Sequence, residues 1–222
     1  MKKLIILLAL IISVLSAYSQ PAVTAGFNLS NCFNDVDISA KFLPGFNAGF
    51  TFDIGDDTRH YAFRPGVTIC SKGWRIDGDI DEKQTFVNYM IQIPVKFIHK
   101  VKLSDNLRLE LGYGCFLDFG VDGNAKVVYP AFDSECVVNG EKQTVHYDKI
   151  TKNFRGKIYG FDNGTQFLAG LSTNRFYGNV TYQGGWRGLN TFLFNIGYFL
   201  KSCQERYSKT QREFNNEDLW NN

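Results

Sequence analysis

Two neighbouring stretches of the chain alternate between apolar and polar positions. In residues 86–97 the odd positions from Val87 onward are apolar or aromatic, whereas the even positions include Asn88 and Lys96. Residues 107–121 repeat this period of two, and a short polar turn joins the two stretches. A sustained period of two predicts β-strands, because successive side chains of a strand point to opposite faces. Both stretches reach the roughly 9–11 residues with which a tilted strand crosses a bilayer, so they predict a membrane-spanning hairpin.

The same alternation recurs in six further segments, which are residues 22–30, 44–54, 60–72, 165–172, 176–183 and 190–201. The apolar rows of these strands contain no Asp, Glu, Lys or Arg. The strand charges lie in the opposite rows, at Asp53, Arg64, Lys96, Arg108, Glu110 and Asp118. A charge at the lipid midplane of a barrel costs about 2–4 kcal/mol, so its absence is typical of a lipid-facing surface. The pattern therefore predicts an all-β fold, an eight-stranded antiparallel up-and-down transmembrane β-barrel.

The connections between these strands alternate in length, which sets the orientation of the predicted barrel. Residues 55–59, 102–106 and 173–175 form short turns, residues 31–43, 73–85 and 122–164 form long loops, and residues 184–189 are intermediate. Outer-membrane barrels have short periplasmic turns and longer extracellular loops. We therefore expect long outer loops and both termini in the periplasm. Pro65 and Pro94 fall inside predicted strands, and we interpret them as β-bulges near the barrel rims.

A soluble secreted barrel, such as a lipocalin-like ligand-binding protein, is the main alternative. Its apolar row would face inward, and its other row would need abundant charge for solvation. That row is instead rich in Gly, Asn, Gln and Thr, which favours the narrow, side-chain-filled interior of a small membrane barrel. The charges of the polar row are then expected to pair with one another in the lumen, because buried charges need partners.

Composition and the N-terminus bear on location. The 222 residues carry a net charge of +2, and this balance disfavours a nucleic-acid partner. Lys2 and Lys3 precede an apolar run at residues 4–15, and small residues follow at positions 17–19. This order predicts a cleavable signal peptide at residues 1–19, rather than an uncleaved anchor helix. Residues 20–201 then form the barrel domain in the outer membrane, and the polar residues 202–222 form a periplasmic tail.

Several short motifs resemble the PorT family of small outer-membrane β-barrel proteins of Bacteroidetes. They are Ala-Gly-Phe-Asn at 25–28, Pro-Gly-Phe-Asn-Ala-Gly at 44–49, Arg-Pro-Gly at 64–66 with Lys-Gly at 72–73, Asn-Tyr at 88–89 with Ile-Gln-Ile-Pro-Val at 91–95, Leu-Gly-Tyr-Gly at 111–114 and Asn-Ile-Gly-Tyr at 195–198. The resemblance spans residues 22–201, except for the loop at 122–164. It implies an outer-membrane barrel with no shared catalytic set.

Candidate chemistry is sparse. His60 and His99 lie at the predicted periplasmic strand ends and are interpreted as interface residues. His146 lies in the long loop near Asp133, Ser134, Glu141 and Asp148, where a nucleophile and base are conceivable only within hydrogen-bond reach. Asp77, Asp79, Asp81 and Glu82 could bind Ca²⁺, but they lack the full spacing of a calcium loop. We predict no catalytic, cofactor-binding or metal-ligating residues, and we interpret the acidic run as a solvated loop tip.

The five cysteines show no metal-binding spacing. Cys32 and Cys136 fall in predicted loops on one side, which leaves a disulfide between them open. The sequence thus predicts a non-enzymatic outer-membrane barrel that acts through its outer loops or its periplasmic tail. Its expected partners are outer-membrane lipid and another envelope protein. A surface lipid-modifying enzyme is a further alternative.

Overall fold

The computed structural model of this chain describes residues 19–32, 40–55, 60–77, 82–138, 141–156 and 160–200. The tail at residues 202–222 and all but the last residue of the expected signal peptide lie outside these ranges, so both stay predictions. Within the described ranges, no helix is long and apolar enough to cross a membrane.

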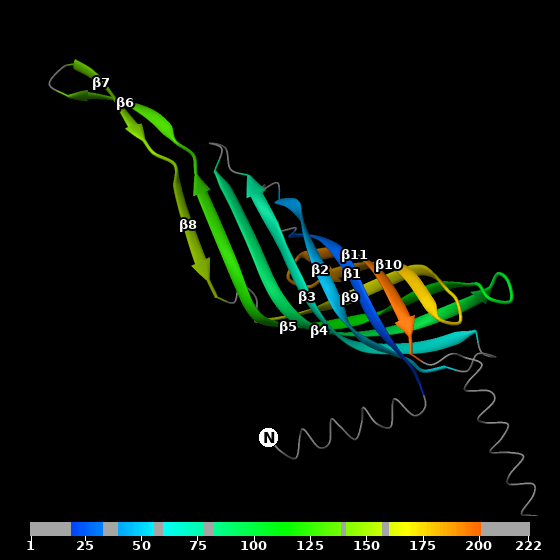
Figure 1. Ribbon diagram of the computed structural model, residues 1–222. Helices are drawn as coiled ribbons and strands as arrows, with labels where there is room; N and C mark the ends of the chain where they lie inside the picture. Colours follow the sequence, from blue (N-terminus) through cyan, green and yellow to red (C-terminus); the bar gives the residue numbers. More distant parts are fainter. Residues whose placement is uncertain are drawn as a thin grey trace, which may run out of the picture.

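The described residues form eleven β-strands (Figure 1). They are β1 (Gln20–Cys32), β2 (Ala40–Asp53), β3 (Tyr61–Asp77), β4 (Lys83–Lys102), β5 (Arg108–Tyr129), β6 (Phe132–Val138), β7 (Glu141–Tyr147), β8 (Ile150–Arg155), β9 (Phe161–Ser172), β10 (Phe176–Gly185) and β11 (Leu189–Phe199). Each of the eight predicted strands corresponds to one of them.

Eight of these strands close into a ring. β1 pairs with β2, β2 with β3, β3 with β4 and β4 with β5; β5 continues to β9, then β10 and β11, and β11 returns to β1. Every pairing is antiparallel, and Val23 on β1 faces both Phe50 on β2 and Tyr198 on β11. The predicted all-β, eight-stranded, up-and-down antiparallel fold is therefore confirmed.

The apolar row of each ring strand points outward. Phe50, Ile69, Phe167 and Ile196 are 56%, 57%, 60% and 70% exposed, whereas Arg64 and Glu110 in the polar rows are 1% and 0% exposed. No Asp, Glu, Lys or Arg lies in the outward rows of the described ring segments 21–29, 44–52, 61–69, 91–101, 109–121, 161–171, 176–182 and 192–198. The lipocalin-like alternative required the apolar rows to face inward, so it is wrong.

Glycine allows a close approach of strands in this ring. Gly114 on β5 lies opposite Lys96 on β4, and a Cβ at Gly114 would lie 2.0 Å from the carbonyl oxygen of Val95. No side chain fits at that distance, so glycine at position 114 allows the backbone of β4 to lie where a Cβ would otherwise project.

The two prolines do not mark bulges, contrary to the sequence interpretation. The β3–β4 and β4–β5 registers continue unchanged past Pro65 and Pro94. The register shifts lie elsewhere, between Phe42 and Asn47 in the β2–β3 pairing and between Tyr89 and Met90 in the β4–β5 pairing. Pro65 pairs with Val95, the residue that follows Pro94, so the two prolines lie close together on the β3–β4 ladder. The two backbone N–H donors that the prolines lack are therefore missing at the same place in the sheet.

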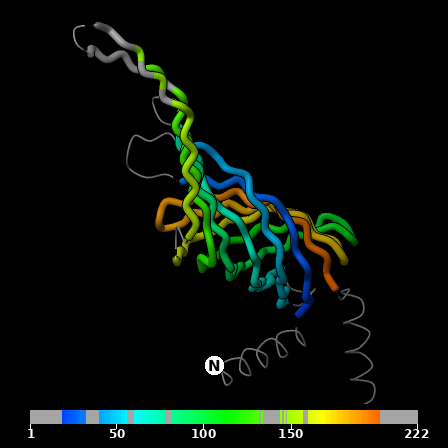
Figure 2. The backbone as a smooth tube through the Cα atoms, turned by 60° about the vertical axis from the view of Figure 1, so that its left-hand side comes forward, coloured from blue at the N-terminus to red at the C-terminus, as the bar shows by residue number. Residues whose placement is uncertain are grey.

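The predicted loop at residues 122–164 is largely β-structure, and this corrects the sequence reading. β5 runs on to Tyr129 and pairs with β8, while β6 and β7 form a separate two-stranded sheet. We call β6, β7, β8 and the part of β5 from residue 122 the arm. Figure 2 shows the arm rising from one side of the ring, away from the end where β1 begins and β11 ends.

The connections confirm the alternation of short and long segments only in part. The turns at residues 103–107 and 173–176 are short and closed by backbone hydrogen bonds. The connection predicted at residues 73–85 is shorter than expected, because β3 continues to Asp77 and β4 begins at Lys83. Residues 33–39 and 56–59, within two further predicted connections, lie outside the described residues.

Candidate functional site

Buried ionic side chains occupy the half of the ring interior nearer the start of β1. We call Asp53, Arg64, Lys100 and Glu110 the lower lumen cluster. The Arg64 guanidinium donates to both carboxylate oxygens of Glu110, at 2.8 and 2.9 Å, and to Asp53 at 2.6 Å. Lys100 Nζ donates to the same oxygen of Asp53 at 2.9 Å. The pairing compensates two carboxylates that would otherwise be costly to bury.

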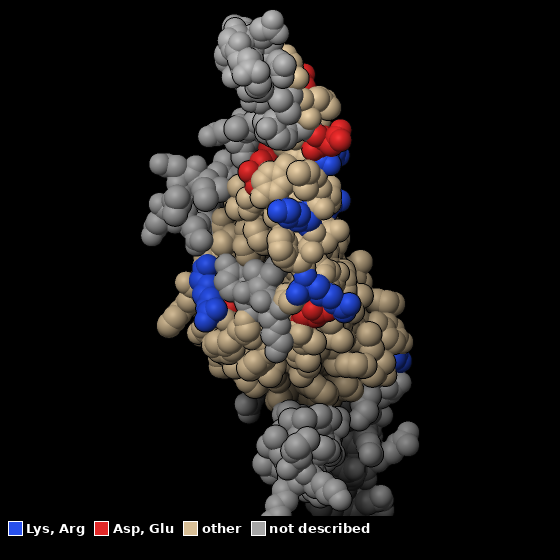
Figure 3. All heavy atoms as spheres, turned by 90° about the vertical axis from the view of Figure 1, so that its left-hand side faces the viewer, with Lys and Arg blue, Asp and Glu red and all other residues tan. Residues whose placement is uncertain are grey.

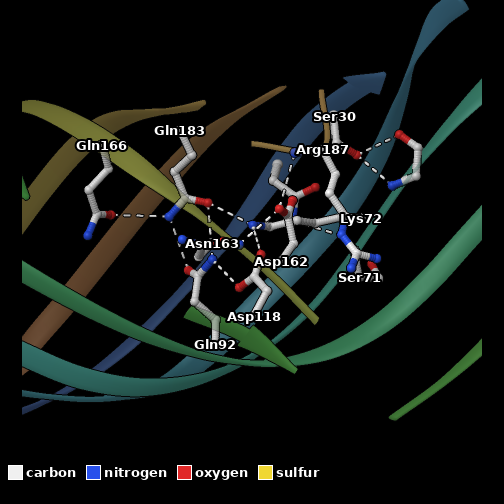
Figure 4. A network of polar contacts seen from close by, with 12 residues as sticks. Ser30, Ser71, Lys72, Gln92, Asp118, Asp162, Asn163, Gln166, Gln183 and Arg187 are labelled. Carbon is white, nitrogen blue, oxygen red and sulfur yellow. Dashed lines mark hydrogen bonds and ion pairs between the residues drawn. The ribbon is translucent and has the colours of Figure 1, made fainter. Parts of the chain in front are cut away.

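A second group lies further up the interior, from β3, β4, β5, β9 and β10. We call Lys72, Gln92, Asp118, Gln166 and Gln183 the upper lumen cluster (Figure 4). Lys72 Nζ donates to Asp118 Oδ2 at 2.7 Å and to Gln183 Oε1 at 2.8 Å, and Gln92 Nε2 donates to Asp118 Oδ1 at 2.7 Å. Gln183 continues the chain of contacts to Gln166 at 3.1 Å. The side chains thus bridge strands on different sides of the ring.

Aromatic rings and an apolar group complete the interior. The Arg64 guanidinium lies 4.5 Å from the Tyr177 ring centroid, and Lys72 Nζ lies 4.7 Å from that of Phe116. Cys32, Cys70, Trp74, Met90 and Leu189 then pack together as a buried apolar cluster.

The polar side chains leave little free space. A cavity of about 20 Å³ lies among them, which is room for about one water molecule. The interior is therefore packed with side chains, as the sequence predicts for eight strands, and a wide passage for solutes would require these pairs to separate.

Cys32 and Cys70 are buried, Cys70 as a free thiol, and Cys115 is an exposed free thiol on the outward row of β5. The disulfide left open between Cys32 and Cys136 is not formed, because Cys32 ends β1 inside the ring whereas Cys136 belongs to β6, far out on the arm (Figure 1).

The histidines do not form a catalytic group with the described side chains. His146 Nδ1 contacts Asp133 Oδ1, and Nε2 lies 3.7 Å from Asp148 Oδ1, but both His146 and Asp133 are 64% exposed. The side chains of Ser134 and Glu141 lie outside the described part of the chain. His99 stacks on Tyr61 at 4.8 Å between ring centroids, next to His60 at the lower end of the ring.

The acidic run suggested as a Ca²⁺ site is only partly described. Asp77 ends β3 and pairs with Lys41 of β2, and this hydrogen bond lowers the pKa of Asp77. Asp79 and Asp81 lie outside the described residues. Among the residues that are described, no group of three or more His, Cys, Asp or Glu side chains is placed to hold a metal ion.

The arm presents mixed chemistry to its surroundings. Tyr129, Ile150 and Phe154 are exposed apolar residues, and Tyr129 lies directly opposite Ile150. Arg155 on β8 binds Asp122 on β5 through two hydrogen bonds, and these hydrogen bonds lower the pKa of Asp122. Figure 3 looks onto this side, where most charged residues gather on the arm and upper ring above a largely uncharged wall. The arm thus combines apolar and ionic contacts in one exposed ribbon.

Comparisons with known proteins give a structural likeness and nothing more. No family model matches the chain, and no curated protein matches it. The chain is similar to Ail, the attachment invasion locus protein of Yersinia pestis, in its structure with the heparin analogue sucrose octasulfate. The sequence identity is 14% and the TM-score is 0.38, and the match covers 81% of this chain and 97% of the Ail chain. Neisserial surface protein A is similar at 12% identity and a TM-score of 0.39, with 80% and 94% covered. At these identities the likeness concerns the fold alone.

The sequence placed most of the lumen charges correctly and missed three in the described residues, which are Lys72, Lys100 and Asp162 on β9, the last 1% exposed. Asp53, Arg64, Glu110 and Asp118 meet in the lumen clusters, Lys96 is buried beside Arg64, and Arg108 is half-buried at the first position of β5. Lys72 and Lys100 were not recognised, although Lys72 shares the row of Arg64 and Lys100 shares the row of Lys96. Extending each inward row by two positions would have found both.

Proposed function

We propose that this chain is a non-enzymatic integral outer-membrane β-barrel protein of the PorT family, exported by a signal peptide, which recognises a partner through its arm. The observation that carries this proposal is the charge-free apolar surface around a closed ring with a packed ionic interior. Monomeric soluble proteins rarely expose contiguous apolar patches beyond about 300–600 Å², whereas the outside of a transmembrane barrel requires an apolar band. Outer-membrane lipid is then the first partner.

The arm is the second part of the proposal. It projects beyond the ring, it exposes Tyr129, Ile150 and Phe154 beside charged residues, and the outer edge of β8 has no strand pairing among the described strands. A rigid scaffold that presents a projecting segment between two of its strands is a common arrangement for recognition. The expected partner on this surface is another envelope protein.

Deleting the distal arm separates scaffold from recognition. Because Asn124 and Arg155 are paired directly, an Asn-Gly turn can replace residues 125–154, which removes Tyr129, Ile150 and Phe154 and leaves a short hairpin. We expect the shortened protein to keep its heat-modifiable migration, since β6, β7 and β8 take no part in the ring pairings of the described strands. Photo-crosslinking from position 155, at the base of the arm, in intact cells should lose the adduct formed by the full-length protein.

A truncation of residues 202–222 is the matched control and should keep the crosslink. If the tail truncation lost the adduct and the arm deletion kept it, the partner would bind the periplasmic tail rather than the arm. Failure of the arm-deleted protein to form a heat-modifiable species would show instead that the distal arm belongs to the fold.

A further inference from the structure

Two buried cations face each other across neighbouring strands of the ring. Arg64 on β3 and Lys96 on β4 are direct partners in the antiparallel register, and both side chains point inward. Like charges at directly opposite positions destabilise a sheet unless something compensates them. Arg64 is compensated by Glu110 and Asp53.

Lys96 has no comparable compensation. It is 9% exposed, and it forms no ion pair or hydrogen bond with any residue in the described ranges. Glu110 attracts it only from beyond ion-pair distance, and both oxygens of Glu110 already accept from Arg64. Around the lower lumen cluster, three cations (Arg64, Lys96 and Lys100) thus face two carboxylates, which leaves one positive charge in excess.

The cavity of about 20 Å³ lies at this position. Its lining includes Arg64 and Lys96 and no Asp or Glu side chain. Asn47 Nδ2, Arg64 Nε and Thr68 Oγ1, all from lining residues, are buried with no hydrogen-bond partner among the described residues. Asn47 and Thr68 are 3% and 7% exposed, so bulk water does not reach them freely. Donors and positive charge therefore converge on a space free of carboxylates.

We propose that this cavity is a binding site for a monatomic anion, with chloride as the ligand. The anion would supply the negative charge that Lys96 lacks and would accept hydrogen bonds from Lys96, Asn47 and Thr68. The volume suits an object close in size to one water molecule. It excludes sulfate, phosphate and organic anions.

Halide-dependent stability tests the proposal with purified mature protein folded in detergent micelles. We expect the thermal unfolding midpoint to be about 2–4 °C higher in sodium chloride or bromide than in sodium gluconate of equal ionic strength, because a ligand bound only by the folded state stabilises it. Lys96→Met should remove this difference, while Lys152→Met, which deletes a cation on the exposed arm, should keep it. Equal midpoints in chloride and gluconate, or a chloride effect that survives in Lys96→Met, would overturn the proposal.

Crystals grown in bromide locate the ion directly. The proposal requires an anomalous scattering peak beside Lys96 Nζ in the wild-type protein and none there in Lys96→Met. A cavity that holds only water, or bromide peaks confined to the outer surface, would show that Lys96 is accommodated without an anion. Neither result would bear on membrane insertion or on the arm, because the ring pairings do not depend on the cavity.

Discussion

Replacing Lys72 by Met should lower the free energy of unfolding by about 3–5 kcal/mol. Lys72 is the cation that pairs with Asp118 at 2.7 Å, and the two side chains are 1% and 0% exposed. Removing Lys72 leaves a buried carboxylate with Gln92 as its remaining side-chain donor. The measurement is urea unfolding of the protein in lipid vesicles, followed by tryptophan fluorescence.

Two further variants make this result specific. Lys41→Met removes an ion pair with Asp77 in which Lys41 is 57% exposed, and it should cost no more than about 1 kcal/mol. Lys72→Met combined with Asp118→Asn should recover most of the loss, because no uncompensated charge remains. If Lys72→Met and Lys41→Met lowered the free energy of unfolding equally, water would have to solvate Asp118 inside the ring, contrary to its burial.

Replacing Val180 by Arg should cost about 2–4 kcal/mol in lipid vesicles. Val180 lies on the outward row of β10, is 44% exposed and has Ala169 and Phe194 as its cross-strand neighbours. The backbone accommodates the longer side chain without a clash, since it points away from the ring. The cost comes from transferring a guanidinium into hydrocarbon, and urea unfolding in vesicles measures it.

The matched control places the same side chain on the arm. Thr144→Arg on β7 should change stability by no more than about 0.5 kcal/mol, since Thr144 is exposed beyond the ring. If Val180→Arg were as neutral as Thr144→Arg, the outward surface of β10 would be in water.

The ring could be predicted from the sequence because period two is a local property. In residues 86–97 and 107–121 the polarity of each side chain shows which face of the strand it occupies. A single row of apolar residues at every second position is therefore enough to identify a strand. The same signal fails in the arm. Before the β4–β5 register shift, the odd-numbered residues of β5 point outward, and Val121 is exposed. After the shift the two faces are interchanged, so Gly123 is buried. Beyond that point, exposure on both faces removes the alternation, and all six residues of β8 are exposed.

The lumen contacts were less predictable than the strands. Row parity places Arg64 and Glu110 inside, but it does not show that strands 46 residues apart in sequence bring them within 2.8 Å of each other. That pairing depends on the tilt and register of the whole ring, which are set by strand partners rather than by local pattern. The excess cation at Lys96 is likewise visible only once every carboxylate has been assigned to a partner.

Spin labelling at Cys115 measures whether the outward row of β5 lies in hydrocarbon or in water. Cys115 is a native outward-facing thiol in the middle of β5, so replacing the other four cysteines leaves one site for a nitroxide. In lipid vesicles, the label should be relaxed strongly by oxygen, which concentrates in hydrocarbon, and weakly by a water-soluble nickel complex, whereas a label at position 144 on the arm should show the reverse. Strong relaxation of the Cys115 label by the nickel complex would contradict a lipid-facing apolar row.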